Sequence, residues 1–280
     1  MKRLLIIDGS NLLFQMFYGM PARIVNGEGK AIQGTLGFVG AMLKIIRRVR
    51  PSHVAVLFDG ECESGRRELD EAYKSGRPDY SGMAEEDTPF SQLPDIYAAL
   101  DYLGIAHKET TDCEADDWIA GYALTLGREF EIVIASQDSD FFQLITDTVS
   151  VLRYRGEKSV LCDPEYIRNK LGIEPGQYAD YKALTGDTAD NIRGAEKIGP
   201  KTAAQLMGEF GSLEALLQAP ERIKKPSVRA SVIRNEQRLR INYRLIRLFP
   251  GAQLPFLPED LAWEDPGVTT TEVLTAIGLR

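Results

Sequence analysis

Three short apolar runs constrain the fold of this chain more than any other feature. They are residues 3–9 (RLLIIDG), 53–60 (HVAVLFDG) and 130–136 (FEIVIAS), and their length and continuous apolar character are typical of strands buried on both faces. Residues 35–49 have helical periodicity and are long enough to cross over between the first two runs, so a right-handed βαβ unit with parallel strands is expected. The sequence therefore predicts an α/β fold with a central, mostly parallel sheet flanked by helices.

Acidic residues follow each of these runs. Asp8 and Asp59 end the first two, and Asp138 and Asp140 come directly after the third. The carboxyl ends of parallel strands meet at one edge of an open α/β sheet, where ligands bind. A single aspartate after a strand is usually a turn or N-cap residue, but three strands that end alike favour a shared metal site.

A further acidic group, Glu114, Asp116 and Asp117, begins the helix-patterned run 118–126. One interpretation is structural, because acids in a first helical turn are stabilised by free N–H groups and by the helix dipole. The other is chemical. Glu114 and Asp117 are three residues apart and share a helix face, and carboxylates aimed into one cleft repel each other unless a cation lies between them.

Two more acids three residues apart, Asp187 and Asp190, precede a glycine turn at residues 194–203 (GAEKIGPKTA). A tight glycine turn with proline at a helix start presents free N–H groups outward, which suits a phosphate oxygen. The turn is not a P-loop, because the required Gly-x-x-x-x-Gly-Lys-Ser/Thr spacing is absent and no strand precedes it. The alternative is an ordinary packing motif of two helices and a turn.

Metal ligands other than oxygen are not indicated. The cysteines form no Cys-x-x-Cys pair, and the histidines lie beside strand-like runs without metal-ligand spacing; these residues are Cys62, Cys113, Cys162, His53 and His107. Any metal would be held by carboxylates, which favours magnesium or manganese. The first apolar run is too short for a signal peptide, and no run approaches the ~20 residues needed to cross a bilayer. A cytoplasmic protein without membrane contact is expected.

Charge is distributed unevenly along the chain. The formal net charge is −8, but residues 222–247 contain nine Lys or Arg and one acid, a local +8, so the rest of the chain carries −16. Within this basic run Arg240, Arg244 and Arg247 have the i, i+4, i+7 spacing of one helix face. The run predicts non-specific, salt-sensitive affinity for nucleic acid. The alternative is a solvated helix face.

Residues 61–92 differ from the rest of the first half. They are polar, with nine acids against four bases, and a stretch this long between core elements is usually functional or disordered. If residues 66–74 are helical, Arg66, Tyr73 and Arg77 fall close to one face, with Lys74 at its side, and they could meet a phosphate. The alternative is a solvated loop.

Beyond the third apolar run the pattern is mostly helical. Residues 149–154 and 159–162 resemble a hairpin that turns at Gly156. Helices are predicted from periodicity and end signals at residues 92–103, 116–126, 164–171, 177–185, 200–210 and 212–219, with a long one near 228–248.

Six motifs occur in the order seen in a known family. They are Asp8-Gly-Ser-Asn, Phe58-Asp59, Glu114-Ala-Asp-Asp117, Asp138-Ser-Asp140, Gly186-Asp-Thr-Ala-Asp190-Asn191 and Ile198-Gly-Pro-Lys-Thr202. Over essentially all 280 residues the chain resembles bacterial 5′-3′ exonucleases of the flap endonuclease superfamily, as found at the N-terminus of DNA polymerase I and as stand-alone proteins. The resemblance implies a PIN-like nuclease core, residues 1–185, with an arch at 61–92. A helical DNA-binding region, 186–280, follows, with a helix-hairpin-helix at 191–206.

The resemblance also implies a site for two divalent cations, Mg²⁺ or Mn²⁺. Its nine ligands match Asp8, Asp59, Glu114, Asp116, Asp117, Asp138, Asp140, Asp187 and Asp190. The first four of these would lie nearer one ion and the last three nearer the other, while Asp117 and Asp138 would be shared or act through water. The acids then serve as ligands rather than as general bases.

Other family positions match residues that would contact DNA. In the arch these are Arg66, Tyr73, Lys74 and Arg77; Lys74 and Arg77 would neutralise phosphate charge, and Tyr73 would stack on an unpaired base. In the helix-hairpin-helix, which in this family grips the duplex backbone and often a potassium ion, they are Arg193, Gly194, Lys197, Ile198, Gly199, Lys201 and Thr202. Arg193 and Lys197 stand where the family usually has proline and glycine.

The function that these likenesses imply is a structure-specific 5′-3′ exonuclease and 5′-flap endonuclease. Its substrate would be DNA with a 5′ flap, a nick or a 5′ end, or an RNA–DNA hybrid, during primer or flap removal in replication and repair. A monomer that works with a separate DNA polymerase is expected. Two alternatives stay open: a catalytically inactive DNA-binding protein, and a PIN-like ribonuclease, although such ribonucleases are usually shorter and lack a hairpin after Asp190. A phosphatase would need Asp-x-Asp after the first strand, which Asp8-Gly9-Ser10 does not supply.

Overall fold

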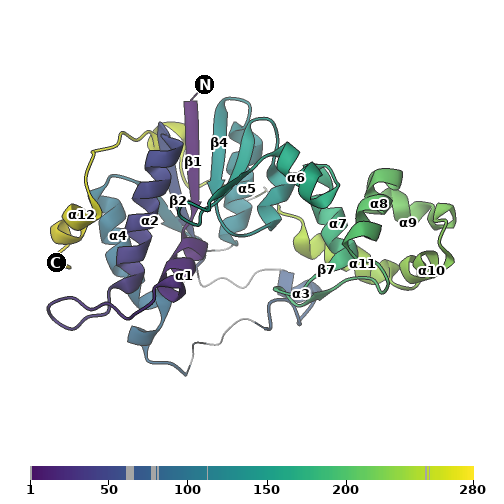
Figure 1. The fold of residues 1–280 in the computed structure, drawn as a ribbon, viewed down its shortest axis with the longest axis horizontal. Helices are drawn as coiled ribbons and strands as arrows, with labels where there is room; N and C mark the ends of the chain where they lie inside the picture. Colours follow the sequence, from purple (N-terminus) through teal and green to yellow (C-terminus); the bar gives the residue numbers. More distant parts are fainter. Residues whose placement is uncertain are drawn as a thin grey trace.

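The computed structural model describes residues 2–60, 66–76, 80, 82–111, 113–249, 251 and 253–280. A six-stranded sheet in the order β3-β2-β1-β4-β5-β6 forms its centre (Figure 1). The strands are β1 (Lys2–Asp8), β2 (His53–Phe58), β3 (Ala106–Glu109), β4 (Phe130–Ala135), β5 (Val149–Arg153) and β6 (Val160–Cys162). All pairings are parallel except that of β5 with β6. The predicted α/β class, the three apolar strands and the hairpin are confirmed.

The register brings the ends of the apolar strands to one edge of the sheet. Along β1, Ile6 pairs with Ala55 of β2 and with Ile134 of β4, and Asp8 pairs with Leu57. The carboxyl ends of β1, β2 and β4 therefore lie level with one another, as the sequence predicts. The edge strand β3 has only four residues (AHKE) and no apolar run, which explains why sequence patterning does not reveal it.

Helices cover both faces of the sheet, because successive side chains of a strand point to opposite faces. On one face Leu5 and Ile7 pack with α1 (Gly9–Gly19), α2 (Gln33–Val49) and α4 (Leu93–Tyr102). On the other face Leu4 and Ile6 pack with α5 (Ala115–Leu126). The last helix, α12 (Thr270–Ala276), returns from the C-terminal part of the chain and packs on α2 and α4 (Figure 1).

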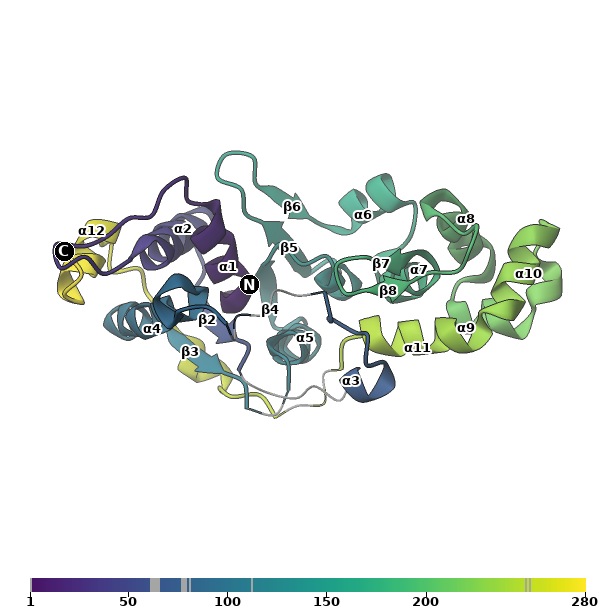
Figure 2. The ribbon, with the colours of Figure 1, turned by 90° about the horizontal axis from the view of Figure 1, so that it is seen from below.

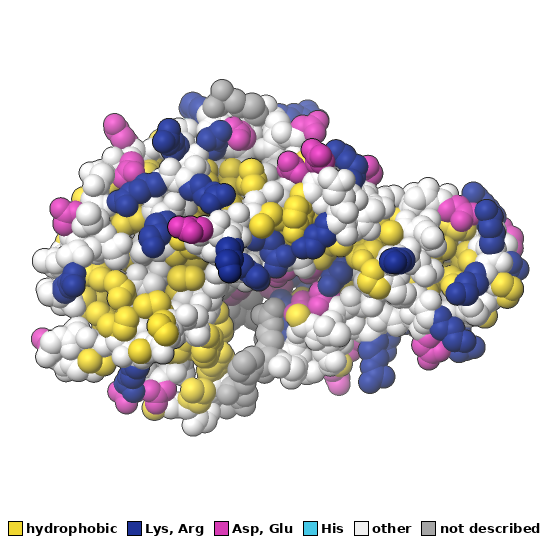
Figure 3. Space-filling model, in the orientation of Figure 1, with side chains coloured by type: hydrophobic (Ala, Val, Ile, Leu, Met, Phe, Trp, Pro, Cys, Tyr) yellow, Lys and Arg dark blue, Asp and Glu magenta, His cyan; other side chains and the backbone are white. Residues whose placement is uncertain are grey.

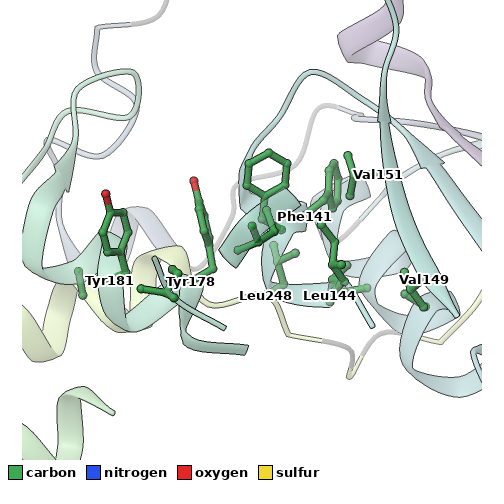
Figure 4. Packing of buried hydrophobic residues seen from close by; sticks show 14 of the residues in the cluster. Phe141, Leu144, Val149, Val151, Tyr178, Tyr181 and Leu248 are labelled. Atoms are coloured by element: carbon green, nitrogen blue, oxygen red, sulfur yellow. The ribbon is translucent and has the colours of Figure 1, made fainter. Parts of the chain in front are cut away.

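The remaining helices form a lobe beside the sheet (Figures 1 and 2). They are α6 (Pro164–Leu171), α7 (Tyr178–Thr185), α8 (Pro200–Phe210), α9 (Leu213–Gln218), α10 (Pro226–Arg234) and α11 (Glu236–Ile246), with the short strands β7 (Gly186–Asp187) and β8 (Ile192–Arg193). Figure 4 shows how Tyr178 and Tyr181 of α7 continue the apolar core that includes Phe141, Leu144 and Leu248. The lobe is therefore joined to the sheet by a continuous core.

Short elements complete the described chain. The four-residue α3 (Arg66–Leu69) lies beside α11 in Figure 2 and contacts it. The 3₁₀ turns are Glu85–Asp87, Pro89–Gln92, Asp140–Leu144, Pro175–Gln177, Pro220–Arg222 and Pro258–Leu261. No helix among the described residues is both long enough and apolar enough to span a membrane.

The single long helix predicted near residues 228–248 is wrong. The chain there forms two helices, α10 and α11, with Asn235 between them. The Asn235 amide donates to the carbonyl oxygen of Ser231 (2.8 Å), and asparagine side chains that bond backbone groups in this way interrupt helices. The second helix also ends at Ile246, so Leu248 lies outside it.

Candidate active site

Asp8 ends β1 and begins α1. Its Oδ1 accepts a hydrogen bond from the backbone N–H of Asn11 (3.0 Å), which caps the helix. Its Oδ2 accepts one from the hydroxyl of Ser136 (2.8 Å), the residue after β4. Burial and the nearby charge of Asp59 raise the pKa of Asp8 to about 7. Asp8 is therefore the N-cap of α1, as the structural interpretation of a single aspartate after a strand predicts, and it also belongs to an acidic site.

Asp59 connects the end of β2 to the start of α5. Its Oδ1 accepts a hydrogen bond from the backbone N–H of Ala115 (2.9 Å), which brings the first turn of α5 to the same edge of the sheet. Asp116 lies in that turn. Loss of hydration and repulsion from Asp138, Asp59 and Asp8 raise the pKa of Asp116 well above its ordinary value. Four acids from four parts of the chain thus share one electrostatic environment.

Asp138 and Asp140 lie in the turn after β4. The N–H of Asp138 donates to the Ser136 hydroxyl (3.0 Å), and the N–H of Asp140 donates to Asp138 Oδ1 (2.8 Å). Burial raises the pKa of both carboxyls, and repulsion from Asp138 raises that of Asp140 further. Asp140 Oδ1 is buried and accepts no hydrogen bond from any residue that the structure describes. A buried carboxylate oxygen without a donor is a ready ligand for a cation.

Asp187 and Asp190 face these acids from the lobe. Their charges contribute to the raised pKa of Asp138 and of Asp140. The turn that carries them is closed by two glycines in contact: Gly186 has φ +80°, and a Cβ atom there would lie 2.4 Å from Gly194 N. Only glycine fits such an approach. The sheet and the lobe therefore each contribute acids to one hollow, where Figure 3 shows acidic side chains bordered by Lys and Arg.

Glu114 and Asp117 are paired with cations in this structure. The guanidinium of Arg66, which is 6% exposed, donates to Glu114 and to Asp117 Oδ1 (2.8 Å). The ammonium of Lys74 lies 3.0 Å from Glu114 Oε2. Both cations come from residues 66–76, the first residues described after β2, which therefore dock over the start of α5; these residues are called the arch base below, after the arch that the resemblance implies. The structure thus brings Arg66 to the acids rather than leaving it exposed for a phosphate.

The donor set suits hard dications. Burial and mutual repulsion raise the pKa values of Asp8, Asp116, Asp138 and Asp140, and Asp140 Oδ1 has no donor among the described residues, so a dication with oxygen ligands would relieve the crowding. As the side chains stand, no three acids of the described residues are grouped to hold one ion. Three of the nine are instead neutralised by Arg66, Lys74 and Lys182, the last lying 2.5 Å from Asp187 Oδ2. Metal binding therefore requires these side chains to rearrange.

The arch base departs from the helix considered in the sequence. The helix α3 ends at Leu69, and the Asp70 carboxylate accepts from the N–H of Ala72 (3.0 Å) to start a turn. Tyr73 is 5% exposed and packs against the lobe, in an apolar cluster with Ile192 and Leu245. Its ring is buried here, so stacking on a base requires it to leave this cluster. Arg77 lies outside the described residues.

The residues of the predicted helix-hairpin-helix, 191–206, run from the turn after α7 through β8 into α8. Ile198 is buried, and the N–H of Ala195 donates to Leu184 O (2.9 Å), which anchors the turn to α7. Lys197 has φ +64°, a conformation that usually requires glycine. Thr202 is partly buried, Gly194 lies at the contact with Gly186, and the others are exposed: Arg193, Lys197, Gly199 and Lys201. Their contact with DNA stays a prediction.

The spacing of Arg240, Arg244 and Arg247 predicts that they share one helix face. The structure does not place all three on one helix. Arg247 lies beyond the end of α11 in extended backbone, with its guanidinium 5.9 Å from the Tyr243 ring centroid. Arg240 pairs with Glu214 (2.5 Å) and Glu236 (3.1 Å). Arg244 is exposed on α11. Of Arg240 and Arg244, Arg244 is therefore the one that could meet a phosphate without first breaking an ion pair that the structure describes.

Family models cover nearly the whole chain. Residues 3–172 match the model described as 5′-3′ exonuclease, N-terminal resolvase-like domain, and residues 173–269 match 5′-3′ exonuclease, C-terminal SAM fold. The chain belongs to the 5′-3′ exonuclease family. The two models meet at residue 172, whereas the division predicted from sequence lies at 185, and that division stays a prediction.

Relatives in this 5′-3′ exonuclease family occur in two forms. Thermostable DNA polymerase I of Thermus thermophilus is 36% identical over 247 residues, which are 88% of this chain and 28% of the polymerase. The chain thus spans about 28% of the length of the polymerase relatives. A 5′-3′ exonuclease of Aquifex aeolicus is 31% identical over 267 residues, covering 95% of this chain and 88% of that protein.

Solved structures agree with the exonuclease fold. T5 5′-exonuclease with bound zinc ions has a TM-score of 0.72 at 24% identity, over 89% of this chain and 90% of that one. The catalytic core of Rad2 in complex with DNA substrate has a TM-score of 0.63 at 17% identity, over 99% and 93%. At these identities the similarity establishes the fold.

Two side chains of the candidate site are not predicted from the sequence. Lys182 pairs with Asp187, and Ser136 bonds Asp8 and the N–H of Asp138. Lys182 is the one Lys or Arg in the helical run 178–185, which leads into Gly186 and Asp187. A cation so close in sequence to a candidate ligand is a signal that could have identified it. Ser136 carries no such signal, because serine after a strand is common in turns.

Proposed function

We propose that the protein is a structure-specific, metal-dependent hydrolase of DNA phosphodiester bonds, acting as a 5′-3′ exonuclease and 5′-flap endonuclease in replication and repair. Flaps and RNA primers are its proposed targets. The observation that carries this proposal is the convergence of Asp8, Asp116, Asp138 and Asp140 at one sheet edge with raised pKa values. Membership in the exonuclease family supports it independently.

The proposed cofactors are two divalent cations, Mg²⁺ or Mn²⁺. Asp8, Asp59, Glu114 and Asp116 would hold one, and Asp140, Asp187 and Asp190 the other. Asp117 and Asp138 would act between them or through water. When bound, such a pair lowers the pKa of a water molecule and stabilises charge on the leaving oxygen. Ser136 and the N–H of Asn11 hold the Asp8 carboxylate in a fixed orientation for this role.

Cationic side chains of the arch would bind the substrate phosphate. Lys74 already points to the acidic edge, with its ammonium 3.0 Å from Glu114. A phosphate entering the site would compete for that ammonium, so Lys74 can orient the scissile group while it offsets the phosphate charge. We propose that Arg77 assists Lys74 and that Tyr73 stacks on an unpaired base. Arg66 would either continue to neutralise Glu114 and Asp117 or turn to the phosphate.

The lobe would grip the duplex. The exposed hairpin residues Arg193, Lys197 and Lys201, with the N-terminus of α8, suit phosphate oxygens, and a potassium ion at the hairpin is part of the proposal. We also propose that the substrates are flap, nicked and RNA–DNA duplexes and that a separate polymerase is a partner. A monomeric state and a cytoplasmic location are part of the same proposal. The T5 enzyme was crystallised with DNA and metal ions and the Rad2 core with DNA, which supports a nucleic-acid substrate.

Product sizing on a 5′-flap and on a nicked duplex, with magnesium, with manganese and with chelator, tests the proposal. We expect cleavage with either metal and none with chelator. Cutting near the flap junction would indicate endonuclease action, and release of short products from the nick would indicate exonuclease action. Binding of both substrates without cleavage under any of these conditions would instead favour the catalytically inactive DNA-binding alternative, and cleavage of RNA alone would favour the ribonuclease.

The basic run gives a prediction about salt dependence. Changing Arg244 to Gln should reduce the slope of log K against log salt for duplex binding by ~0.9, because one phosphate contact and its released counterion are lost. Arg240→Gln should reduce the slope less, since Arg240 is already paired with Glu214 and Glu236. Fluorescence anisotropy over a salt series measures both slopes. Equal slopes for Arg244→Gln and the unchanged protein would remove the run from the binding surface.

A further inference from the structure

Lys74 is held in a backbone conformation that its side chain disfavours. Its φ is +57°, in the left-handed region that residues with a Cβ atom rarely occupy. The backbone N–H of Lys74 donates to Asp190 O (3.1 Å), and its ammonium reaches Glu114. A residue in this region persists only where its surroundings hold it there. The contacts of the neighbouring residues should therefore identify what holds it.

Asn191 supplies those contacts. Its side-chain amide donates to Ala72 O (3.0 Å) and to the hydroxyl of Ser75 (3.1 Å), one on each side of Lys74. Asn191 itself has φ +57°, which asparagine tolerates better than most residues. Together with the bond from Lys74 N–H to Asp190 O, three hydrogen bonds join residues 72–75 to residues 190–191. Each of the two segments carries one residue of the proposed site, Lys74 and Asp190.

Two other contacts between the arch base and the lobe fix its position but not its direction. The Tyr73 ring packs in an apolar cluster with Ile192 and Leu245, and such packing is non-directional. Asp70 pairs with Arg238 of α11 at 2.7 Å, but Arg238 is about half exposed, so the pair contributes little. Hydrogen bonds are directional. The amide of Asn191 is therefore the side-chain contact from the lobe that can set how residues 72–75 are turned, alongside the backbone bond from Lys74 N–H to Asp190 O.

We propose that Asn191 is a positioning residue for Lys74. By holding Ala72 and Ser75, its amide keeps Lys74 in the left-handed conformation that directs the ammonium into the acidic site. The inference rests on the proposed function, in which Lys74 orients the scissile phosphate. Removing the amide frees Lys74 to point elsewhere, so the cleavage rate falls while the affinity for duplex DNA, which the lobe supplies, stays nearly constant.

Two substitutions at this position separate the amide from the backbone. Asn191→Gly removes both hydrogen bonds without strain, because glycine adopts φ +57° freely. Asn191→Asp keeps the shape and the tolerance for this conformation but replaces the donating nitrogen with an acceptor, so the bond to Ala72 O is lost. The aspartate is the second variant should the glycine variant fold poorly, which thermal unfolding would reveal.

The test is a double-substitution cycle with Lys74→Ala under single-turnover conditions, using a 5′-flap substrate and magnesium. Losing two ordinary hydrogen bonds predicts a rate about tenfold lower for Asn191→Gly. In the Lys74→Ala background the same change should alter the rate less than about twofold, since it acts through Lys74. An equal loss in both backgrounds, or a rate like that of the unchanged protein, would overturn the inference.

A second readout does not depend on cleavage. Hydrogen exchange of residues 70–76 should be faster in Asn191→Gly than in the unchanged protein, because those amides lose their anchor. Unchanged exchange would overturn the proposed contact even if cleavage fell. If the unchanged protein did not cleave DNA at all, the proposed function would fail, and a rise in exchange would then show that Asn191 holds the segment for another purpose.

Discussion

Changing Asp138 to Asn should reduce the proposed DNA cleavage by about a thousandfold or more and leave duplex binding nearly intact. Asp138 interacts electrostatically with acids of both parts: its pKa is raised by burial and by the charges of Asp190 and Asp187 of the lobe, and its own charge raises the pKa of Asp116. Removing its charge weakens the hold on both proposed cations, and metal-ion stabilisation of a transition state supplies several kcal/mol.

The asparagine variant is a sharp test because it preserves the local turn. Its amide oxygen can still accept from the N–H of Asp140, as Asp138 Oδ1 does at 2.8 Å. Asp138→Ala should lose as much activity, and the matched control Asp147→Asn, an exposed acid in the next loop, should lose almost none. Single-turnover rates and anisotropy on one flap substrate measure both quantities. Activity of Asp138→Asn within about twofold of the unchanged protein would refute the assignment.

The metal-free protein should be less stable at pH 8 than at pH 6. Burial raises the pKa of Asp8 to about 7 from 3.8, and the pKa values of Asp116, Asp138 and Asp140 are raised as well. Between about pH 4 and pH 7 the folded chain therefore binds more protons than the unfolded chain, so stability falls as pH rises through this window. Thermal unfolding in chelator should show a lower Tm at the higher pH.

Magnesium should offset this loss. A ligand at 100 times its Kd stabilises by about 2.7 kcal/mol, which corresponds to a rise in Tm of roughly 5–10 °C for a chain of this size. The Asp8→Asn variant should show a smaller difference between pH 6 and pH 8, since one raised carboxyl is gone. Were the Tm in chelator the same at both pH values for both proteins, the acids would not be crowded as described.

Sequence patterning located the acids well because they follow strongly apolar strands. Strand order alone predicts that Asp8, Asp59 and Asp138 lie at one edge; Asp187 and Asp190 stand out as two acids three residues apart, and only the resemblance predicts that they join the same site. The arch base could not be placed in the same way. Arg66 and Tyr73 look exposed in a polar segment, but they are buried by contacts with α5 and α11, more than forty residues away in the chain.

The misplaced helix elements have similar causes. The side chain of Asn235 bonds the carbonyl oxygen of Ser231 at the end of α10. The sequence does not show whether an asparagine in a helical pattern will continue the helix or interrupt it in this way. The helix α12 is seven residues long and is stabilised by packing on α2 and α4 rather than by its own periodicity. Periodicity therefore predicts that a segment is helical, whereas a break such as the one at Asn235 and a short helix such as α12 depend on contacts that the sequence pattern does not show.

The central claim is that the crowded carboxylates bind a pair of dications. Titration of the metal-free protein with Mn²⁺, followed by electron paramagnetic resonance, counts the bound ions directly. We predict two ions per chain for the unchanged protein, with selective loss of one ion in Asp116→Asn and of the other in Asp187→Asn. Failure to bind any ion at millimolar Mn²⁺, or binding that neither variant alters, would contradict the account.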